Sequence, residues 1–415
     1  MSFRGWRVLA AMMSVRGVGG GINLYGSSLF VLPIQGDLGI SRGAISTLFA
    51  VGMLVRHLGS PLSGRLIDRF GARRMLLFTL LLSGGGYVAL AGATNIVVLF
   101  VVYVGFVSLG FHALLFQAPS VIINNWFDRR KALAMSLLQV GAGVGGAIIV
   151  PLLGLAISWW DWRVASMLAG AALLLVGLPA LVVTRDTPEE VGELPDGDSA
   201  ADWAIRQRGA PAGTSLREAI RTPAYWLMTL TMMSFSSAAG AVAFHFVPIL
   251  DDKGISEAAA TGLLGTFALL SVPVIVFTGW LGDRFNRLKV SAWMTATVGV
   301  GIVVLNIGES VAVVGVAALL MAGTQGVYPL LWAATGDAFG RRGFGAIRGS
   351  IEGFLVLGLA TPALFGFLHD WQGDYRVALW IATGSCAISA TLALVTAGRL
   401  EAHRLERSSQ PAPAS

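Results

Sequence analysis

The sequence has little charge, a single cysteine and few histidines. Charged residues make up 13% of the 415 residues, against roughly 25% in soluble domains. The lone Cys386 excludes a disulfide framework or a cysteine-based metal site within one chain, and the 5 histidines form no metal or nucleophile motif. Hydrophobic residues reach 55%, and mean hydropathy is +0.72. This composition predicts an all-α, polytopic membrane protein that needs no cofactor and is not an enzyme.

Twelve apolar runs are long enough to cross a bilayer, which takes roughly 20 residues. The predicted spans are residues 7–34, 43–66, 75–93, 96–125, 132–158, 163–184, 223–250, 257–281, 289–308, 310–338, 344–368 and 375–397.

The basic residues are distributed unevenly between the two sets of loops. Of the 29 Lys and Arg, 22 lie at the termini or in loops on the side of the termini, and only 4 lie in the opposite loops. The positive-inside rule therefore places both termini in the cytoplasm, with the chain in the plasma (cell inner) membrane. Because these cations lie between apolar runs, the net charge of +6 does not indicate nucleic-acid binding.

The chain divides into four parts. We expect a six-helix half over 1–184, a cytoplasmic linker over 185–222, a second six-helix half over 223–397 and a cytoplasmic tail over 398–415. The linker is rich in Pro, Gly and acidic residues, which favours flexibility. Near its end Ser215-Leu-Arg-Glu218 fits a capping box and predicts a short amphipathic helix.

The two halves repeat. A shift of 215 residues aligns Pro33 with Pro248, Gly39 with Gly254 and Ser41 with Ser256. The same shift aligns the charged turn at 64–70 with that at 279–285, and a shift of 212 aligns the Phe-x-Arg-Arg motifs at 127–130 and 339–342. A nearly constant offset across separate motifs predicts two halves related by a pseudo-two-fold axis along the membrane normal.

The charged turn Gly64-Arg-Leu-Ile-Asp-Arg-Phe-Gly-Ala-Arg-Arg-Met75 resembles the signature between helices 2 and 3 of the major facilitator superfamily. The resemblance implies that Asp68 contacts the start of the eleventh predicted span, 344–368, and that this contact steadies the outward-open state. The helix dipole also favours an anion at the start of a helix. The residues expected in gating are Gly64, Asp68, Arg69, Arg73, Asp283, Arg284 and Arg348.

Three further segments resemble the monocarboxylate-transporter and oxalate/formate-antiporter branch of that superfamily. They are residues 125–134, 215–226 and 336–345. The resemblance implies alternating access and carriage of a small monocarboxylate or dicarboxylate, by proton symport or anion exchange. In that branch a basic residue on helix 8 meets the substrate carboxylate, but helix 8 of this chain, 257–281, has no Arg, Lys or His.

Arg16 and Arg56 are candidates for the displaced positive charge. Each lies ten residues or so from the cytoplasmic end of its helix, which places it about 15 Å deep. An arginine at that depth costs on the order of 3 kcal/mol to insert. The repeat pairs Arg16 with Thr231 and Arg56 with Ser271, so the duplicated architecture does not require a cation there. Either the arginines bind substrate at one shared level, or they bond backbone carbonyls and snorkel.

Other polar residues in the spans have two interpretations each. Arg348 and Glu352, four residues apart on helix 11, form either a self-neutralising pair or a gate with a protonatable carboxylate. The candidates for proton coupling, or for plain structural hydrogen bonding, are His57, His112, His245 and Glu352. The candidates for substrate binding, or for helix–helix hydrogen bonding, are Arg16, Asn23, Tyr25, Arg56, Gln117, Gln325, Tyr328 and Trp332.

Three functions remain open. The first is a monomeric secondary transporter of a small organic anion, driven by a proton or counter-anion gradient across the lipid bilayer. The second is a proton-coupled exporter of drugs or other hydrophobic compounds, favoured by the uncharged helix 8. The third is a membrane receptor or sensor. Uptake assays separate the first two, since only an anion carrier depends on Arg16 or Arg56.

Overall fold

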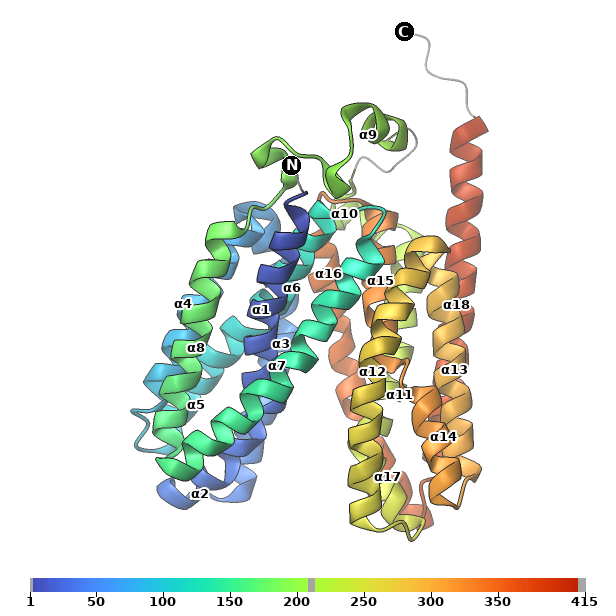
Figure 1. Ribbon diagram of the computed structural model, residues 1–415. Coiled ribbons are helices and arrows are strands. Elements are labelled where there is room, and N and C mark those ends of the chain that lie inside the picture. The colour runs from blue at the N-terminus through green and yellow to red at the C-terminus, as the bar shows by residue number, and fades with distance from the viewer. Residues whose placement is uncertain (1–2, 208–212, 410–415) are drawn as a thin grey trace. The chain divides into compact units, whose positions relative to one another are not determined.

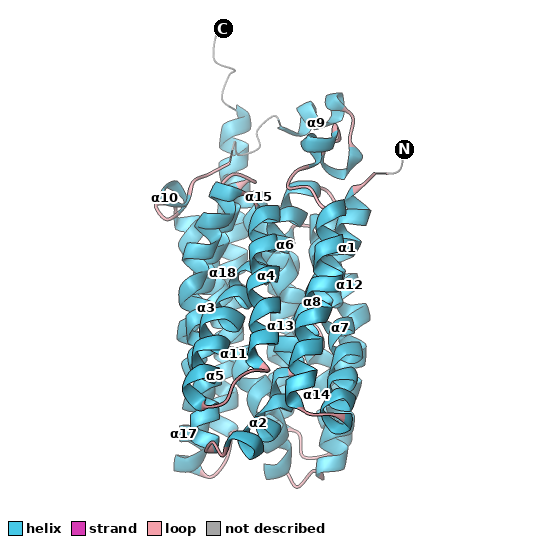
Figure 2. Ribbon diagram, turned by 90° about the vertical axis from the view of Figure 1, so that its left-hand side faces the viewer, coloured by secondary structure: helices cyan, strands magenta, loops and turns pink. Residues whose placement is uncertain are grey.

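The computed structural model describes residues 3–207 and 213–409. Over these residues the regular structure consists of helices joined by loops and turns, and it contains no strand (Figure 2). Two compact units divide the chain. Unit 1 comprises residues 1–129, 137–205 and 341–353, and unit 2 comprises residues 130–136, 206–340 and 354–415. Each unit therefore includes the first residues of a helix that continues in the other.

Unit 1 contains most of the first half of the chain. Its helices are α1 (Gly5–Gly20), the π-helix η1 (Gly21–Tyr25), η2 (Ser27–Phe30), α2 (Val31–Leu38), α3 (Arg42–Phe70), α4 (Ala72–Leu90), α5 (Ile96–Val102), the π-helix η3 (Tyr103–Ser108), α6 (Leu109–Trp126), α7 (Lys131–Trp159, from residue 137), α8 (Trp162–Val183), η4 (Pro188–Val191), η5 (Pro195–Gly197), α9 (Ala200–Gln207) and α16 (Phe344–Phe354, to residue 353).

Unit 2 contains most of the second half. Its helices are α10 (Leu216–Ala219), α11 (Pro223–Asp252), α12 (Glu257–Arg284), α13 (Arg287–Ile307), α14 (Val311–Met321), α15 (Thr324–Phe339), η6 (Leu355–Ala360), α17 (Thr361–Gln372) and α18 (Arg376–Ser409).

Within each unit long helices lie side by side (Figure 1). In unit 1, α4 packs against α8 and α6, and Gly84 and Gly170 bring α4 and α8 together, since a Cβ on Gly170 would lie 2.5 Å from the Gly84 carbonyl oxygen. In unit 2, α18 packs along α11 and α13. Small residues at such crossings are typical of membrane helices, where close packing replaces the hydrophobic effect.

Many of the helices are long and apolar enough to span a membrane. Among the described residues eight qualify, and a ninth if the bent pair 5–25 and 27–38, with an angle of 46°, forms one span. The first of the eight is Gly43–Phe70, and the last is Arg376–Ala402. The chain is therefore a multi-pass membrane protein.

The repeated motifs build the same local structure twice. Gly39 and Gly254 both adopt a left-handed backbone, with φ of 63° and 71°, which ends the preceding helix without the Cβ strain of other residues. Ser41 and Ser256 then cap the next helix by accepting hydrogen bonds from Ala44 N and Ala259 N. The identical residues thus mark identical turns.

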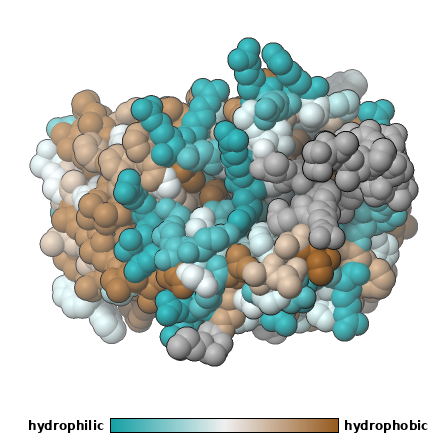
Figure 3. Space-filling view, turned by 90° about the horizontal axis from the view of Figure 1, so that it is seen from above, coloured by the Kyte–Doolittle hydropathy of each residue, from teal (hydrophilic) through white to brown (hydrophobic). Residues whose placement is uncertain are grey.

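The central segment is more ordered than its composition predicts. The expected capping box is confirmed, since Ser215 Oγ accepts a bond from Glu218 N and Glu218 accepts one from Ser215 N. Residues 185–205, expected to be flexible, instead fold onto unit 1 as η4, η5 and most of α9. Hydrophilic side chains gather on this end of the helices, while hydrophobic ones lie along its edge (Figure 3).

Acidic side chains hold residues 185–207 in place. Asp186 accepts a 2.6 Å bond from Arg73 N at the start of α4, and Asp196 accepts bonds from Asp128 N and Arg129 N. Glu189 pairs with Arg341 at 2.7 Å. Burial raises the pKa of the Asp186 carboxyl, although the bond from Arg73 N opposes this change. The carboxylates, which in the sequence favoured a flexible segment, accept backbone hydrogen bonds as caps or form ion pairs.

Candidate transport site and gates

A close crossing of α1 and α7 positions Arg16. A Cβ on Gly145 would lie 1.9 Å from the Gly17 carbonyl oxygen, and one on Gly17 would lie 2.9 Å from that of Gly141. Only glycine permits this approach. The glycine-rich run 141–146 therefore packs helices, and it brings Gln139 on α7 within reach of Arg16 on α1.

Arg16 is buried, with 9% of its surface exposed, and its partners are neutral. One terminal nitrogen donates to Gln139 Oε1 at 2.6 Å, and the other donates to the Phe116 carbonyl oxygen at 3.5 Å. The guanidinium also lies over the Phe116 ring, 4.6 Å from its centroid. Arg16 Nε has no hydrogen-bond partner in the described part of the chain.

Arg56 on α3 is half-buried and also bonds to neutral groups. Its terminal nitrogen donates to Asn23 Oδ1 at 2.5 Å, and its Nε donates to the Gly52 carbonyl at 3.2 Å. Asn23 Nδ2 in turn donates to the Tyr87 hydroxyl at 3.2 Å. Asn23 therefore links η1, α3 and α4 and orients the Arg56 guanidinium.

The structure separates the two arginines, for which the sequence left a shared level open. The partner of Arg56, Asn23, lies seven residues beyond Arg16 on the helix formed by α1 and η1. Neither arginine has an acidic partner among the described residues. Both charges are thus bound only by neutral groups, whose dipoles compensate a cation only in part.

Arg348 and Glu352 form the predicted pair, 2.9 Å apart on α16. The pair continues into a buried network, because Gln117 Nε2 donates to Glu352 at 2.5 Å and Ser63 Oγ donates to Gln117 Oε1 at 2.7 Å. The pair also lies within electrostatic range of Arg16, where its two charges act in opposite directions. Glu352 is therefore a carboxylate held within a polar network inside unit 1.

The histidines differ in their surroundings. His245 on α11 is buried, and both of its ring nitrogens are bonded: Nε2 donates to the Pro362 carbonyl at 2.8 Å, and Nδ1 lies 3.0 Å from the Tyr375 hydroxyl. His57 Nδ1 donates to the Met53 carbonyl of its own helix. The side chain of His112 lies outside the described side chains.

The remaining substrate-binding candidates lie in separate units. Tyr25, in unit 1, is 44% exposed and packs on Gly146. In unit 2, Tyr328 on α15 donates to Ser236 Oγ at 3.1 Å, and Trp332 is buried on the same helix as Gln325. These three α15 residues form their own polar and aromatic group within unit 2.

The contact expected of Asp68 is present in unit 1. The Asp68 carboxylate accepts bonds from Gly345 N at 2.9 Å and Ala346 N at 2.7 Å, at the start of α16. Gly64 lies against Gly345, where a Cβ would come within 2.1 Å of the carbonyl oxygen. Nearby, Arg73 Nε donates to the Leu181 carbonyl, and Arg69 lies over Phe70.

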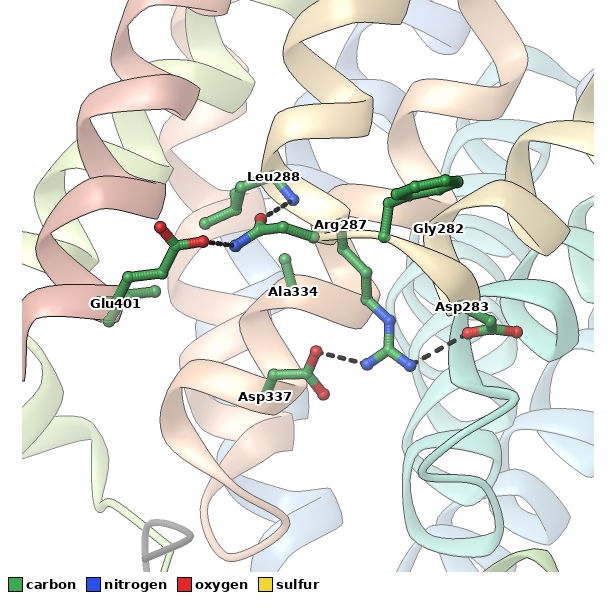
Figure 4. Close-up of a pocket in the computed structure, with 10 residues that line it drawn as sticks. Gly282, Asp283, Arg287, Leu288, Ala334, Asp337 and Glu401 are labelled. Atoms are coloured by element: carbon green, nitrogen blue, oxygen red, sulfur yellow. Dashed lines mark hydrogen bonds and ion pairs between the residues drawn. The ribbon is translucent and has the colours of Figure 1, made fainter. Parts of the chain in front are cut away.

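Unit 2 contains the equivalent cap with more charge. Asp283 accepts bonds from Ala132 N at 2.8 Å and Leu133 N at 3.0 Å, at the start of α7. Arg287 lies between Asp283 and Asp337 and donates to both, beside a pocket of about 180 Å³ (Figure 4). Lys131 pairs with Asp337 at 3.0 Å.

Sequence reasoning found some of these residues and missed others. Gln139, Arg287, Asp337 and Lys131 were not predicted as site residues. A polar residue beside a glycine run marks Gln139, and Lys131 directly follows the repeated Phe-x-Arg-Arg motif, so both had a local signal. Arg284, predicted in gating, lies over the Trp280 ring instead of bonding the acidic pair.

Comparison with known families gives one consistent result. The model of the Major Facilitator Superfamily matches residues 16–351 and again 249–414. Among curated proteins the chain is 26% identical over 360 residues to monocarboxylate transporter 13 of Bos taurus, covering 85% of this chain and 80% of the relative. It is 28% identical to the gallate transporter of Pseudomonas putida, covering 88% and 89%. It is 24% identical to the oxalate:formate antiporter of Oxalobacter formigenes, covering 82% and 78%.

Solved structures share the fold. The fucose:proton symporter of E. coli superimposes with a TM-score of 0.71 at 17% identity, covering 94% of this chain and 98% of the symporter. The proton:xylose symporter XylE also gives 0.71, at 14% identity and with 96% of both chains covered.

Proposed function

Since this chain belongs to the Major Facilitator Superfamily, we propose that it is a secondary transporter of a small organic anion that binds at Arg16 and Arg56. The relatives named for transport of monocarboxylates, oxalate and formate, and gallate support this substrate class. The chain is a transporter and not an enzyme.

One observation carries the proposal: within the described residues, two intramembrane arginines bond only to neutral groups. A substrate carboxylate would neutralise the positive charge of each arginine, and the Arg16 Nε–H would be available to donate a hydrogen bond to it. Charge-assisted hydrogen bonds of this kind contribute about 1.5–3 kcal/mol each. Asn23 and Gln139 then act as positioning residues, which hold the guanidinium groups while the site is empty.

Glu352 is the proposed proton-coupling group. It is the acidic member of a buried network that also contains Arg348 and Gln117, and it lies in electrostatic range of Arg16. A proton taken up by Glu352 would leave Arg348 and Arg16 as net positive charge, which favours anion binding. Protonation of Glu352 and binding of the substrate anion would thus be linked within unit 1. His245, with both nitrogens bonded, is better suited to a structural role.

The proposed setting is the cell inner membrane, with both termini in the cytoplasm. The 22 basic residues on the side of the termini, against 4 on the other, support this orientation. We propose that the transporter works as a monomer.

Uptake into proteoliposomes tests the function. Labelled lactate, pyruvate, oxalate, formate, gallate and the longer diacids suberate and terephthalate would be offered with and without an inward proton gradient, to wild type and to the Arg16→Gln and Arg56→Gln variants. Saturable uptake of one acid that is strongly reduced in either variant is the expected result. If correctly inserted protein takes up no acid, the proposal fails and the exporter hypothesis replaces it.

A further inference from the structure

The spacing of Arg16 and Arg56 narrows the class of substrate. Arg16 lies on α1, while Arg56 bonds Asn23, which is seven residues further along. At 1.5 Å per residue this is an axial separation of about 10 Å. Arg16 and Arg56 therefore lie at different heights along the helices of unit 1.

A second pair of helices gives a similar spacing. Arg16 stacks on Phe116 of α6. Arg56 Nε bonds the Gly52 carbonyl, and Gly52 lies against Ser108, since a Cβ there would be 2.6 Å from Ser108 Oγ. Ser108 and Phe116 are eight residues apart, or about 12 Å along a helix. Two independent sets of contacts thus place the residues that hold the two guanidinium groups about two helical turns apart.

One carboxylate cannot bind both cations. A charge-assisted bond from a guanidinium to a carboxylate oxygen is about 2.7–2.9 Å long, so each arginine needs an acid group at its own level. Between Arg16 and Asn23 the chain reads Gly17-Val-Gly-Gly-Gly-Ile22 and offers no polar side chain. Gly17, Gly20 and Gly21 pack against α7, so this segment gives the portion of a ligand that joins the two acid groups no polar partner.

We propose that the substrate is a dicarboxylate whose acid groups are joined by a hydrocarbon spacer, one group on Arg16 and the other on Arg56. This inference rests on the proposed function and deepens it, because it excludes simple monocarboxylates as the best substrates. It also excludes oxalate, in which the two carboxyl carbons are bonded directly. Aliphatic diacids such as suberate and aromatic diacids such as terephthalate fit the spacing.

The test compares each diacid with its monomethyl ester, which keeps the length and removes one charge. Full-length protein in proteoliposomes would take up labelled suberate or terephthalate in competition with unlabelled diacid, monoester, oxalate or lactate. Each diacid is expected to compete at least tenfold more strongly than its monoester. Arg56→Gln should bring diacid and monoester to equal strength, whereas Lys289→Gln, which removes an exposed cation paired with Glu401, should leave the preference unchanged.

The outcomes separate this inference from the proposed function. Saturable uptake with diacid and monoester equal in wild type would overturn the dicarboxylate proposal and leave anion transport standing. Absence of uptake for every acid, by correctly inserted protein, would overturn both. If Arg56→Gln fails to insert, Arg56→Lys serves instead and should weaken the preference without abolishing uptake. The wild-type comparison alone remains decisive.

Discussion

The two units share an aspartate cap at the start of a helix and differ in their interiors. Asp68 in unit 1 and Asp283 in unit 2 each accept two backbone N–H bonds at the start of a helix. At depth the units diverge, because the repeat partners of Arg16 and Arg56 are Thr231 and Ser271.

The uncharged partners show what the scaffold itself needs. Thr231 and Ser271 donate to the carbonyls of Leu227 and Phe267 on their own helices, so these positions are satisfied without a cation. The aspartate caps, which both units contain, serve the fold and its movement. The two arginines, which only unit 1 contains, point to the substrate. The arginines are thus additions to a scaffold that folds without them, at an insertion cost of about 3 kcal/mol each.

The largest effects are expected from neutralising these arginines. Arg16→Gln and Arg56→Gln should each reduce uptake about 10- to 150-fold, since each loses a charge-assisted bond to the anion worth about 1.5–3 kcal/mol. Thr231→Ala and Ser271→Ala, at the paired positions of unit 2, should change uptake less than twofold. Initial rates at equal levels of inserted protein measure the difference. If the variants of unit 1 and those of unit 2 lose uptake equally, the arginines have no role that distinguishes unit 1.

The next largest effect concerns the close approach at the gates. Gly64→Ala places a Cβ 2.1 Å from the Gly345 carbonyl oxygen, which is backbone and cannot rotate away. Overpacking of this kind costs about 1–3 kcal/mol and should reduce uptake about tenfold. In unit 2, Gly279→Ala meets Ser136 Oγ first, at 2.5 Å, and should be milder.

Gly59→Ala provides the control for this glycine pair. Gly59 lies on α3 as Gly64 does, but a Cβ added there would meet no neighbouring atom of the described chain within 4 Å. Uptake and thermal stability in detergent should match wild type. A loss as large as that of Gly64→Ala would show that α3 resists any added side chain, and the crossing with α16 would then have no special role.

Local motifs were predictable because their causes lie within a few residues. Gly39 and Ser41 mark a turn and a cap. The contact of Asp68 with Gly345, 277 positions away, was expected from the family resemblance and not from local sequence. Other contacts between distant residues were not predictable. Gln117 and Glu352 meet across 235 positions, and no periodicity specifies which faces of α6 and α16 turn together.

The prediction that the segment 185–207 is flexible failed for another reason. Its acidic residues and prolines have the composition of a disordered linker, but Asp186 and Asp196 accept bonds from backbone N–H groups elsewhere in unit 1. Composition counts charges and does not show where their partners lie. The sequence left open whether Arg16 and Arg56 share one level, because helix depth alone does not show where a long side chain bonds.

Glu352 tests whether coupling, too, belongs to unit 1. Glu352→Gln keeps an acceptor for Arg348 but removes the titratable group, so uptake should persist at a reduced level and lose most of its dependence on the proton gradient. His245→Gln, in unit 2, should retain that dependence. Uptake measured with and without an inward gradient decides between them. If His245→Gln flattens the response and Glu352→Gln does not, the coupling site lies in unit 2.

The two aspartate caps should give smaller and unequal effects. Asp68→Asn loses the acceptor for one of two N–H bonds, about 1 kcal/mol, and should slow uptake about fivefold. Asp283→Asn also removes a partner of Arg287, which retains Asp337. Transport by Asp283→Asn should therefore fall at least as far. Normal uptake by Asp68→Asn at normal surface expression would show that this cap does not act in gating.

The smallest effect is expected where residues 185–207 meet Arg341. Burial opposes ionisation of Glu189, but the hydrogen bond from Arg341 prevails and lowers the pKa of the Glu189 carboxyl. A lowered pKa means that the pair stabilises the fold above the ordinary glutamate value of about 4.3, and that this contribution is lost as pH falls through the lowered value. The pair is partly exposed, so Glu189→Gln should cost roughly 0–1 kcal/mol. Hydrogen exchange of residues 185–207 should rise slightly in the variant at neutral pH and equal wild type in acid. A large rise would mean that this one pair, and not the set of acidic caps together, holds the segment on unit 1.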